Sequence, residues 1–224
     1  MSEEIDHKRS IKSNYNIHHV LARIANKLIC AFTMTDCEII GEENLQNLPR
    51  PYVLVANHCS NWDPLVLSAY FPDVLNFMIK KDLHDIRNFG AMSTLSGNIV
   101  VSKGGIDLEA IKGATFLLKN GYNLALFPEG TRSKTGRIEG FKDVGVGIAS
   151  KCKVPIVPVY IKKTYDILKK GDRLPKGGVA QIHILPAVMT TCESGQLECS
   201  EINDINQMIY QSLKTYEKEI SFKS

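Results

Sequence analysis

The amino-acid sequence predicts an α/β fold in which a central sheet is covered by helices. Short apolar strand patterns and longer helical patterns alternate along the chain. Its 224 residues are enough for one well-buried domain and leave room for a second only if that domain is small. No internal repeat, low-complexity tract or linker divides the sequence. We therefore expect one domain, residues 36–224, preceded by an N-terminal amphipathic helical arm, residues 1–35.

The N-terminal arm is predicted to form its helix over residues 16–34. Apolar side chains recur there at helical spacing, namely Ile17, Val20, Leu21, Ile24, Leu28, Ala31 and Phe32. Residues 8–35 also carry five Lys or Arg and no Asp or Glu. Two interpretations are open, because the apolar stripe could pack on the protein's own domain or lie on an anionic membrane surface.

The strands that follow are predicted from short apolar runs bounded by turn residues. They cover residues 38–41, 52–56, 75–79, 98–101, 123–127, 154–161 and 178–185. The run at 154–161 holds two prolines, which argue against a central strand because proline lacks the N–H that a ladder needs. Its place in the sheet is therefore left open by the residues alone.

Helical patterns separate and follow these strands. One begins at Pro64, and others cover residues 107–119, about 146–151 and about 200–219. Asp63 before Pro64 matches a helix N-cap followed by proline at the first helical position. Asn120 and Gly121 after residue 119 are a typical C-terminal stop. The alternation of these helices with the strands is what predicts the α/β class.

Composition and charge exclude several classes of protein. With 44% hydrophobic and 23% charged residues, the chain is neither disordered nor collagenous. A net charge of +3 is too small to argue for a nucleic-acid partner, although residues 151–176 carry eight Lys or Arg against two Asp. The six cysteines form no CxxC pair or close cluster, so neither a metal site nor a disulfide framework is expected.

The start of the chain lacks the features of a targeting segment. Glu3, Glu4 and Asp6 stand where a signal peptide carries basic residues. No apolar run reaches the roughly 18 residues that a spanning helix needs. We therefore expect a protein that stays inside the cell, with no signal peptide and no spanning helix.

The first candidate site follows the predicted strand 52–56 and reads Asn-His-Cys-Ser-Asn-Trp-Asp over residues 57–63. Across this turn the Asp63 carboxylate can hold one imidazole nitrogen of His58 while the other faces a substrate hydroxyl as a general base. Asp63 also fits a plain helix N-cap, with His58 merely ending the strand. A third interpretation makes Cys59 or Ser60 a nucleophile beside His58.

The second candidate site, Phe-Pro-Glu-Gly-Thr-Arg-Ser over residues 127–133, follows another apolar strand. Its Pro-Glu-Gly-Thr segment is a turn by composition alone. Arg132 stands close to further cations such as Lys142, and a guanidinium with glycine and threonine donors nearby suits a phosphate or carboxylate group. Lys103 ends the strand near 98–101 and is another candidate ligand. These residues indicate a small anionic substrate.

Four stretches in this order, NHCSNWD, GNIVVSK, FPEGTRS and VPIVPV, together resemble the four sequence blocks of the glycerolipid acyltransferase family. The resemblance runs over about residues 37–185 and includes a Lys-rich segment at 80–81. It implies an α/β fold with a mixed central sheet flanked by helices, and a fourth block that accepts prolines in a strand. This sequence departs from the family at Lys103, where Arg is common, so a point charge replaces a bidentate fork.

The resemblance also implies roles for the candidate residues. His58 resembles the family's general base, which deprotonates the acceptor hydroxyl for attack on an acyl thioester, and Asp63 resembles its orienting carboxylate. The substrate-binding residues expected from the same blocks are Asn57, Lys80, Lys103, Glu129, Gly130, Thr131 and Arg132. Arg132 is the expected phosphate ligand among them. No acyl-enzyme, metal ion or cofactor is implied beyond the acyl thioester itself.

The implied reaction moves a fatty acyl group from acyl-CoA or acyl carrier protein to the sn-2 hydroxyl of lysophosphatidic acid, forming phosphatidic acid in phospholipid biosynthesis. Another lysophospholipid or lyso-aminolipid acceptor, a Cys or Ser hydrolase and an inactive lipid-binding module stay open as alternatives. A lipid substrate favours the membrane interpretation of the basic arm. We therefore expect a peripheral protein on the cytoplasmic face of a membrane, with membrane lipids and the acyl carrier as partners.

Overall fold

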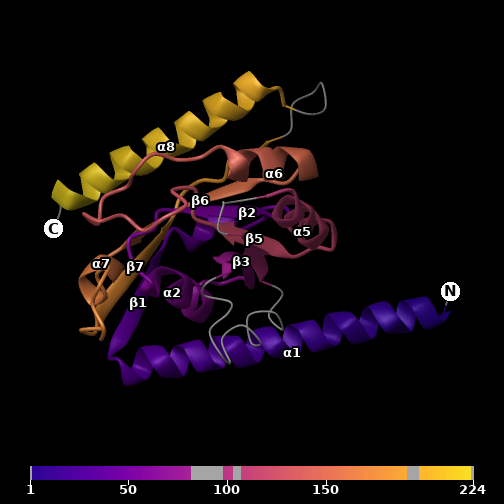
Figure 1. Ribbon diagram of the computed structural model, residues 1–224, viewed down its shortest axis with the longest axis horizontal. Helices are drawn as coiled ribbons and strands as arrows, with labels where there is room; N and C mark the ends of the chain where they lie inside the picture. The colour runs from indigo at the N-terminus through magenta and orange to yellow at the C-terminus, as the bar shows by residue number, and fades with distance from the viewer. Residues whose placement is uncertain (1, 82–97, 103–106, 191–196, 223–224) are drawn as a thin grey trace.

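The computed structural model describes residues 2–81, 98–102, 107–190 and 197–222, and Figure 1 shows a central sheet between helices. The strands are β1 Thr35–Ile40, β2 Val53–Ala56, β3 Leu75–Lys80, β4 Ile99–Val101, β5 Asn123–Leu126, β6 Ile156–Lys162 and β7 Gly178–Ile184. They form a seven-stranded sheet in the order β1-β7-β6-β2-β5-β3-β4. Neighbouring strands run parallel except β6 and β7, which are antiparallel. The predicted α/β class and the mixed sheet are confirmed.

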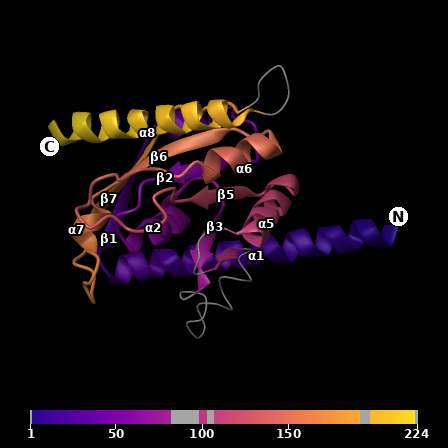
Figure 2. The ribbon, with the colours of Figure 1, turned by 45° about the horizontal axis from the view of Figure 1, so that its top comes forward.

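Two layers of helices cover the two faces of the sheet, as the two views agree (Figures 1 and 2). One layer holds α5 Leu108–Lys119, α6 Val144–Cys152 and α8 Cys199–Phe222, and the other holds α1 Ser2–Phe32, α2 Trp62–Tyr70 and α7 Thr164–Ile167. A short 3-10 helix, η1 Glu42–Leu45, follows β1. In β2, Val53 and Val55 belong to the core under α5, α6 and α8, whereas Leu54 and Ala56 belong to the core under α2. Strands buried on both faces read as continuous apolar runs, which is why β2 shows no alternation.

Strand β6 is central despite its prolines, since it lies between β7 and β2. Pro155 precedes the strand. Pro158 lies one residue before Val159, the first residue paired in the β6–β7 ladder, and its carbonyl accepts a hydrogen bond from the Leu185 N–H at 2.9 Å. The missing proline N–H therefore falls at the end of the antiparallel ladder, where the sheet loses little by it.

Helix α1 packs on the domain through its polar face. The Arg23 guanidinium donates to three backbone carbonyls at the end of α2, which belong to Ala69, Phe71 and Pro72, at 3.3, 2.6 and 3.3 Å. The Asn26 amide donates to the Ser68 hydroxyl at 2.8 Å. His19 is buried in the same contact, and burial lowers its pKa to about 4, so the imidazole is neutral. These polar residues are three or four positions apart, so they lie on one face of α1, and that face packs against the domain.

The apolar face of α1 consequently points outward. The side chains of Ile17, Val20, Leu21, Ile24, Leu28 and Phe32 are all exposed. Phe32 is 91% exposed and Leu28 64%, far more than a packed helix stripe would be. The helix therefore packs on its own domain, but not by the stripe that amphipathicity alone would bury. Among the helices of the described residues, none has the length and apolar character to cross a membrane.

Candidate active site

The two candidate loops leave the same edge of the sheet. β2 and β5 are parallel neighbours with Val55 opposite Leu126, so the loops that follow them begin side by side. The His58 N–H donates to a carboxyl oxygen of Glu129 at 2.8 Å, and the Ser133 N–H donates to the His58 carbonyl at 2.8 Å. Hydrogen bonds to the main chain of His58 thus bring the two sequence motifs into one site.

His58 and Asp63 form a direct pair. The imidazole Nδ1 lies 2.8 Å from Oδ2 of Asp63, whose side chain is fully buried. Because the carboxylate accepts from Nδ1–H, the lone pair is left on Nε2. Nε2 has no hydrogen-bond partner in the described part of the chain, and the imidazole is 18% exposed. The ring stacks on Phe127 with centroids 4.2 Å apart, which fixes its plane. This is the geometry of an oriented general base.

The alternative interpretation of Asp63 as a helix N-cap is wrong. Helix α2 begins at Trp62, so Asp63 lies within its first turn, and the N-cap Asn61 makes no side-chain capping bond. Asp63 Oδ2 instead accepts from the backbone N–H groups of Cys59 and Ser60, each at 2.8 Å. With the His58 ring, three donors therefore converge on one carboxylate oxygen, and the turn wraps around the carboxylate.

Cys59 and Ser60 are committed to buried contacts. The Cys59 thiol is 3% exposed, lies 3.3 Å from the Thr164 hydroxyl, and has its pKa raised well above the ordinary value by burial. The Ser60 hydroxyl is fully buried and donates to the Leu168 carbonyl at 2.7 Å. Neither side chain presents a reactive atom beside the free Nε2 of His58, which argues against the nucleophile interpretation.

Glu129 braces the site from the second loop. Its carboxyl group is buried, and its two oxygens accept from the N–H of His58 at 2.8 Å and of Glu139 at 3.3 Å. Burial raises the pKa of Glu129 to about 7, above its ordinary value. Both oxygens are thus engaged with the main chain, whereas the family resemblance implies that this residue binds the acceptor. Its contact with the acceptor stays a prediction.

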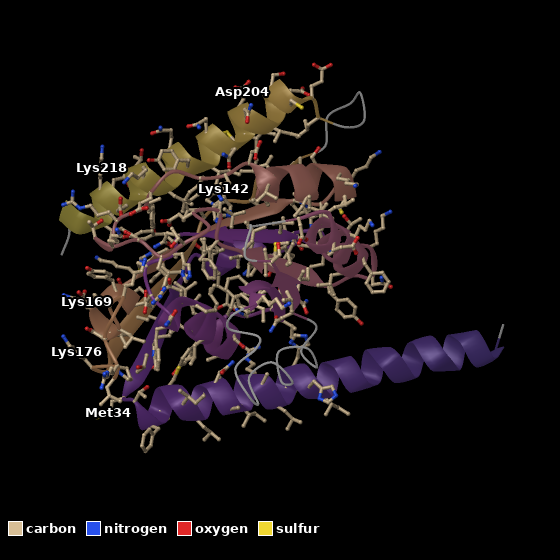
Figure 3. All side chains as sticks on the ribbon, viewed as in Figure 1. Met34, Lys142, Lys169, Lys176, Asp204 and Lys218 are labelled. Atoms are coloured by element: carbon tan, nitrogen blue, oxygen red, sulfur yellow. The ribbon has the colours of Figure 1, made fainter. Side chains whose placement is uncertain are left out.

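Gly130, Thr131 and Arg132 form the exposed tip of the second loop. Gly130 has φ +69°, and a Cβ at this position would lie 3.3 Å from Nζ of Lys142. Arg132 is partly exposed, and its guanidinium makes no hydrogen bond or ion pair with any residue that the structure describes. Lys142, labelled in Figure 3, is exposed as well. Arg132 at the tip and Lys142 beside it have no ion-pair partner among the described residues and can bind an anion next to the loop that carries His58.

The other predicted substrate-binding residues are placed differently. The Asn57 amide donates to the Ile161 carbonyl at 2.9 Å and accepts from the Ile161 N–H at 2.7 Å, so it ties the end of β2 to β6. Lys80 is the last residue of β3, whose carboxyl end opens on the same edge of the sheet. Lys103 lies outside the described residues. No cluster of three His, Cys, Asp or Glu suited to a metal ion occurs in the ranges that the structure describes.

Glu217 on α8 is a contributor that sequence reasoning missed. It is buried, and its carboxyl group accepts from the Ile138 N–H at 3.0 Å while Lys214 pairs with it at 3.1 Å. The next residue, Glu139, donates its N–H to Glu129, so α8 holds the loop that braces His58. The available signal was an acidic residue four positions after Leu213, on the apolar stripe of the last helix.

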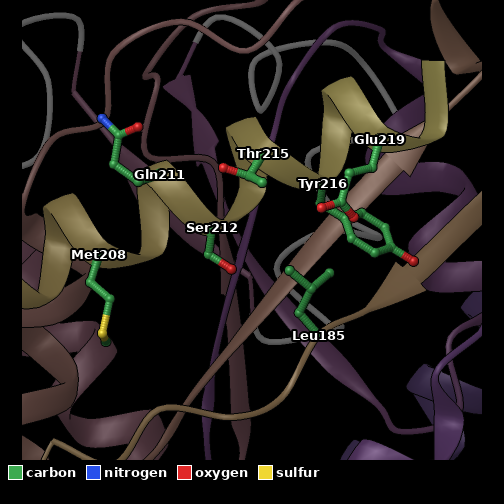
Figure 4. A pocket seen from close by; sticks show the side chains of 7 residues that line it. All are labelled: Leu185, Met208, Gln211, Ser212, Thr215, Tyr216 and Glu219. Carbon is green, nitrogen blue, oxygen red and sulfur yellow. The ribbon is translucent and has the colours of Figure 1, made fainter. Parts of the chain in front are cut away.

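A groove of about 440 Å³ lies beside α8, apart from these residues (Figure 4). Its lining consists of Leu185, Met208, Gln211, Ser212, Thr215, Tyr216 and Glu219. None of the residues predicted to act in catalysis or substrate binding contributes to it.

Comparison with known proteins gives a consistent picture. The acyltransferase family model matches residues 37–162. The chain is 33% identical to the 1-acyl-sn-glycerol-3-phosphate acyltransferase of Saccharomyces cerevisiae over 161 residues, which are 69% of this chain and 52% of that protein. It is 29% identical to the alpha enzyme of that name from Mus musculus, over 77% of this chain and 60% of that protein. The chain thus spans about half the length of the curated relatives it matches.

A solved structure is similar over most of the chain. The crystal structure of the 1-acyl-sn-glycerophosphate (LPA) acyltransferase PlsC from Thermotoga maritima matches with a TM-score of 0.75 and 26% identity. The match covers 91% of this chain and 79% of the other. The likeness therefore extends beyond the segment that the family model matches, toward both ends of the chain.

Proposed function

The chain belongs to the acyltransferase family, and on that premise we propose that it moves a fatty acyl group from an acyl thioester to the sn-2 hydroxyl of 1-acyl-sn-glycerol 3-phosphate. The product is phosphatidic acid, and the role is in phospholipid biosynthesis. The observation that carries this proposal is the His58 imidazole, held through Nδ1 by buried Asp63 and open at Nε2 beside a cationic loop. The names of the similar proteins support the acceptor, while acyl-CoA and acyl carrier protein are both suitable donors.

The proposed reaction needs one oriented base and two bound substrates. His58 Nε2 takes the proton of the sn-2 hydroxyl while the hydroxyl oxygen forms a bond to the thioester carbonyl carbon. Collapse of the tetrahedral intermediate breaks the C–S bond, and the leaving thiolate takes the proton from the imidazolium. Asp63 stabilises the imidazolium between these steps. A thioester is already activated, so the proposed reaction needs no metal or further cofactor, and nucleic acid has no part in it.

The cations at the tip of the second loop are proposed to hold the acceptor phosphate. Arg132 has no partner in the described chain and can offer a bidentate fork to a phosphate. Lys142 adds a point charge next to Gly130, whose missing side chain leaves room there. The site therefore combines a general base and an anion-binding loop on adjacent strand ends.

Thiol release from acyl-CoA is expected to depend on lysophosphatidic acid, and Arg132→Ala is expected to raise the KM for that acceptor about tenfold or more. Removing a phosphate ligand weakens acceptor binding but leaves the base in place, so kcat is expected to change less. The measurement is continuous thiol detection with purified protein, at varied acceptor and at varied acyl-CoA.

The control is Arg137→Ala, which removes an exposed cation from the same loop. A KM for acyl-CoA that rises as much as that for the acceptor would contradict the phosphate assignment. Thiol release that proceeds equally without any acceptor would identify a hydrolase instead. Activity that appears only with acyl carrier protein, or only with another lysolipid, would correct the donor or the acceptor.

We further propose that the protein is peripheral, docking on the cytoplasmic face of a membrane through the outward face of α1. Its lipid substrate and product require access to a bilayer. The polar contacts of Arg23 and Asn26 fix the helix on α2 and leave the apolar side chains facing away from the domain. An amphipathic helix with that orientation suits the boundary between headgroups and acyl chains.

Replacing Leu28 and Phe32 together by Gln is expected to weaken binding to phosphatidylcholine vesicles by about tenfold or more, because two apolar side chains lose burial in the bilayer. Both side chains are exposed in the protein, so unfolding temperature is expected to stay unchanged. Vesicle flotation measures the binding. The matched control is Met208→Gln, which makes the same kind of change at an exposed position on α8, in the opposite layer. If both variants bind the vesicles equally, α1 does not dock on the membrane and serves only to pack on the domain.

A further inference from the structure

The segment between α7 and β7, residues 168–177, is a strongly cationic loop that the proposed reaction does not use. We call it the basic loop. Its cations, Lys169, Lys170, Arg173 and Lys176, are all exposed. None of them forms an ion pair with any residue of the described ranges, and Asp172 is the single acid among them. Of its two leucines, Leu168 is buried, whereas Leu174 is 78% exposed.

The basic loop is attached to the end of α1. Gly178, directly after the loop, donates its N–H to the carbonyl of Met34, two residues beyond α1, at 2.9 Å. The Lys176 N–H donates to the carbonyl of Ile167 at the end of α7, also at 2.9 Å. Gly177 has φ +72°, and a Cβ there would lie 2.9 Å from the Thr33 carbonyl oxygen. Only glycine allows the two segments to approach this closely. Figure 3 shows Met34 beside Lys176, with Lys169 on the same side of the molecule.

This attachment places the cations next to the outward apolar face of α1. Phe32, which ends that face, and Met34, two residues beyond the helix, are 91% and 80% exposed. Figures 1 and 2 both show the basic loop beside this end of α1, at one end of the long helix. The exposed cations of the loop and the exposed apolar side chains of α1 thus lie next to each other at the C-terminal end of the helix.

From this juxtaposition we propose that the basic loop binds the headgroups of anionic lipids and is a second membrane contact beside α1. The proposal rests on the proposed membrane docking of α1. Cations and exposed apolar side chains in one surface match a bilayer, where acyl chains lie beneath charged headgroups. A nucleic acid would engage the cations but leave Leu174, Phe32 and Met34 without a partner, so the apolar residues favour the membrane.

The loop adds a lipid preference to docking. Apolar burial by α1 does not depend on headgroup charge, whereas four cations that form no ion pair with the described residues respond to it. The proposed acceptor and product are themselves anionic lipids, so a membrane rich in them would retain the enzyme. The basic segment at residues 151–176 holds eight cations, and four of them lie in the basic loop. The proposal therefore gives a role to half of the cations in that segment.

The test compares the full chain with a variant in which Lys169, Lys170, Arg173 and Lys176 are all changed to Gln. The vesicles are phosphatidylcholine alone, or phosphatidylcholine with about a third phosphatidylglycerol. On anionic vesicles the variant is expected to bind about tenfold or more weakly than the unchanged protein, since each cation near such a surface contributes about fivefold. On neutral vesicles the two proteins are expected to bind equally. High salt is expected to abolish the difference.

The matched control changes four other exposed cations to Gln: Lys119, Lys151, Lys153 and Lys218. These lie on or next to α5, α6 and α8, the layer opposite α1, and the net charge falls by the same amount. The control is expected to lose less than about threefold on anionic vesicles, because charges far from the surface are screened.

The outcomes distinguish a failure of the loop proposal from a failure of the proposed membrane docking of α1. If the loop variant and the control bind anionic vesicles equally while the Leu28 and Phe32 variant loses binding to both, α1 docks and the loop proposal is overturned. If the Leu28 and Phe32 variant binds neutral vesicles like the unchanged protein, the docking premise itself fails. Binding of duplex DNA that the loop variant loses, with vesicle binding unaffected, would assign the cations to a nucleic acid and overturn the proposal.

Discussion

The His58→Ala enzyme is expected to lose kcat by about 100- to 10,000-fold, with little change in the KM for either substrate. The imidazole is the one group at the site whose open nitrogen can take the hydroxyl proton, because Nδ1 is held by Asp63. The fold is expected to survive, since the contacts that join His58 to Glu129 and Ser133 are made by its main chain. The measurement is acceptor-dependent thiol release, with circular dichroism and thermal unfolding alongside.

The control for this loss is His18→Ala, which removes an imidazole from the partly exposed side of α1. It is expected to keep the kcat of the unchanged enzyme. A His58→Ala protein that retained more than about a tenth of kcat would contradict the general-base assignment. A protein that lost activity together with its thermal transition would show a structural role instead.

The pairing of His58 with Asp63 was predictable because it is local. Five positions across one turn bring the two side chains within reach, and the turn is set by the residues between them. The sequence also left the helix N-cap open for Asp63, because Asp before Pro64 satisfies that pattern equally well. The structure distinguishes the two roles of Asp63, because the N–H groups of Cys59 and Ser60 donate to its carboxylate.

The partners of Glu129 and Asn57 were not predictable from the sequence. Glu129 meets His58 because β5 lies beside β2, and Asn57 meets Ile161 because β6 lies on the other side. Strand order is a property of the whole fold, and no spacing within one motif encodes it. Both side chains were therefore assigned to substrate, while the structure gives each of them hydrogen bonds to backbone groups.

Helix α1 shows a different limit. Periodicity located its apolar stripe, but periodicity alone favours burying that stripe against the domain. The packing is decided by Arg23, which finds three carbonyls at the end of α2 that its guanidinium can satisfy. The sequence does not show which backbone groups an arginine on a helix will contact. The outward orientation of the apolar face of α1 is therefore known only from the structure.

Asp63→Asn is expected to lower kcat by about 100-fold or more while the protein stays folded. The amide is isosteric, and its oxygen can still accept from the N–H groups of Cys59 and Ser60. It carries no negative charge, however, and cannot stabilise the imidazolium that forms when His58 takes the proton. The loss is expected in kcat rather than in KM, measured by the same thiol assay. Asp166→Asn, an exposed change on α7, is the control.

The double variant His58→Ala/Asp63→Asn tests whether Asp63 acts through His58. If the carboxylate serves only to orient and stabilise the imidazole, its removal costs nothing once the imidazole is gone, and the double variant keeps the kcat of His58→Ala. If the two losses multiply instead, Asp63 contributes by holding the turn of residues 59 and 60, and thermal unfolding of Asp63→Asn then falls with kcat. The non-additivity therefore separates a positioning role in catalysis from a structural role that the same hydrogen bonds also permit.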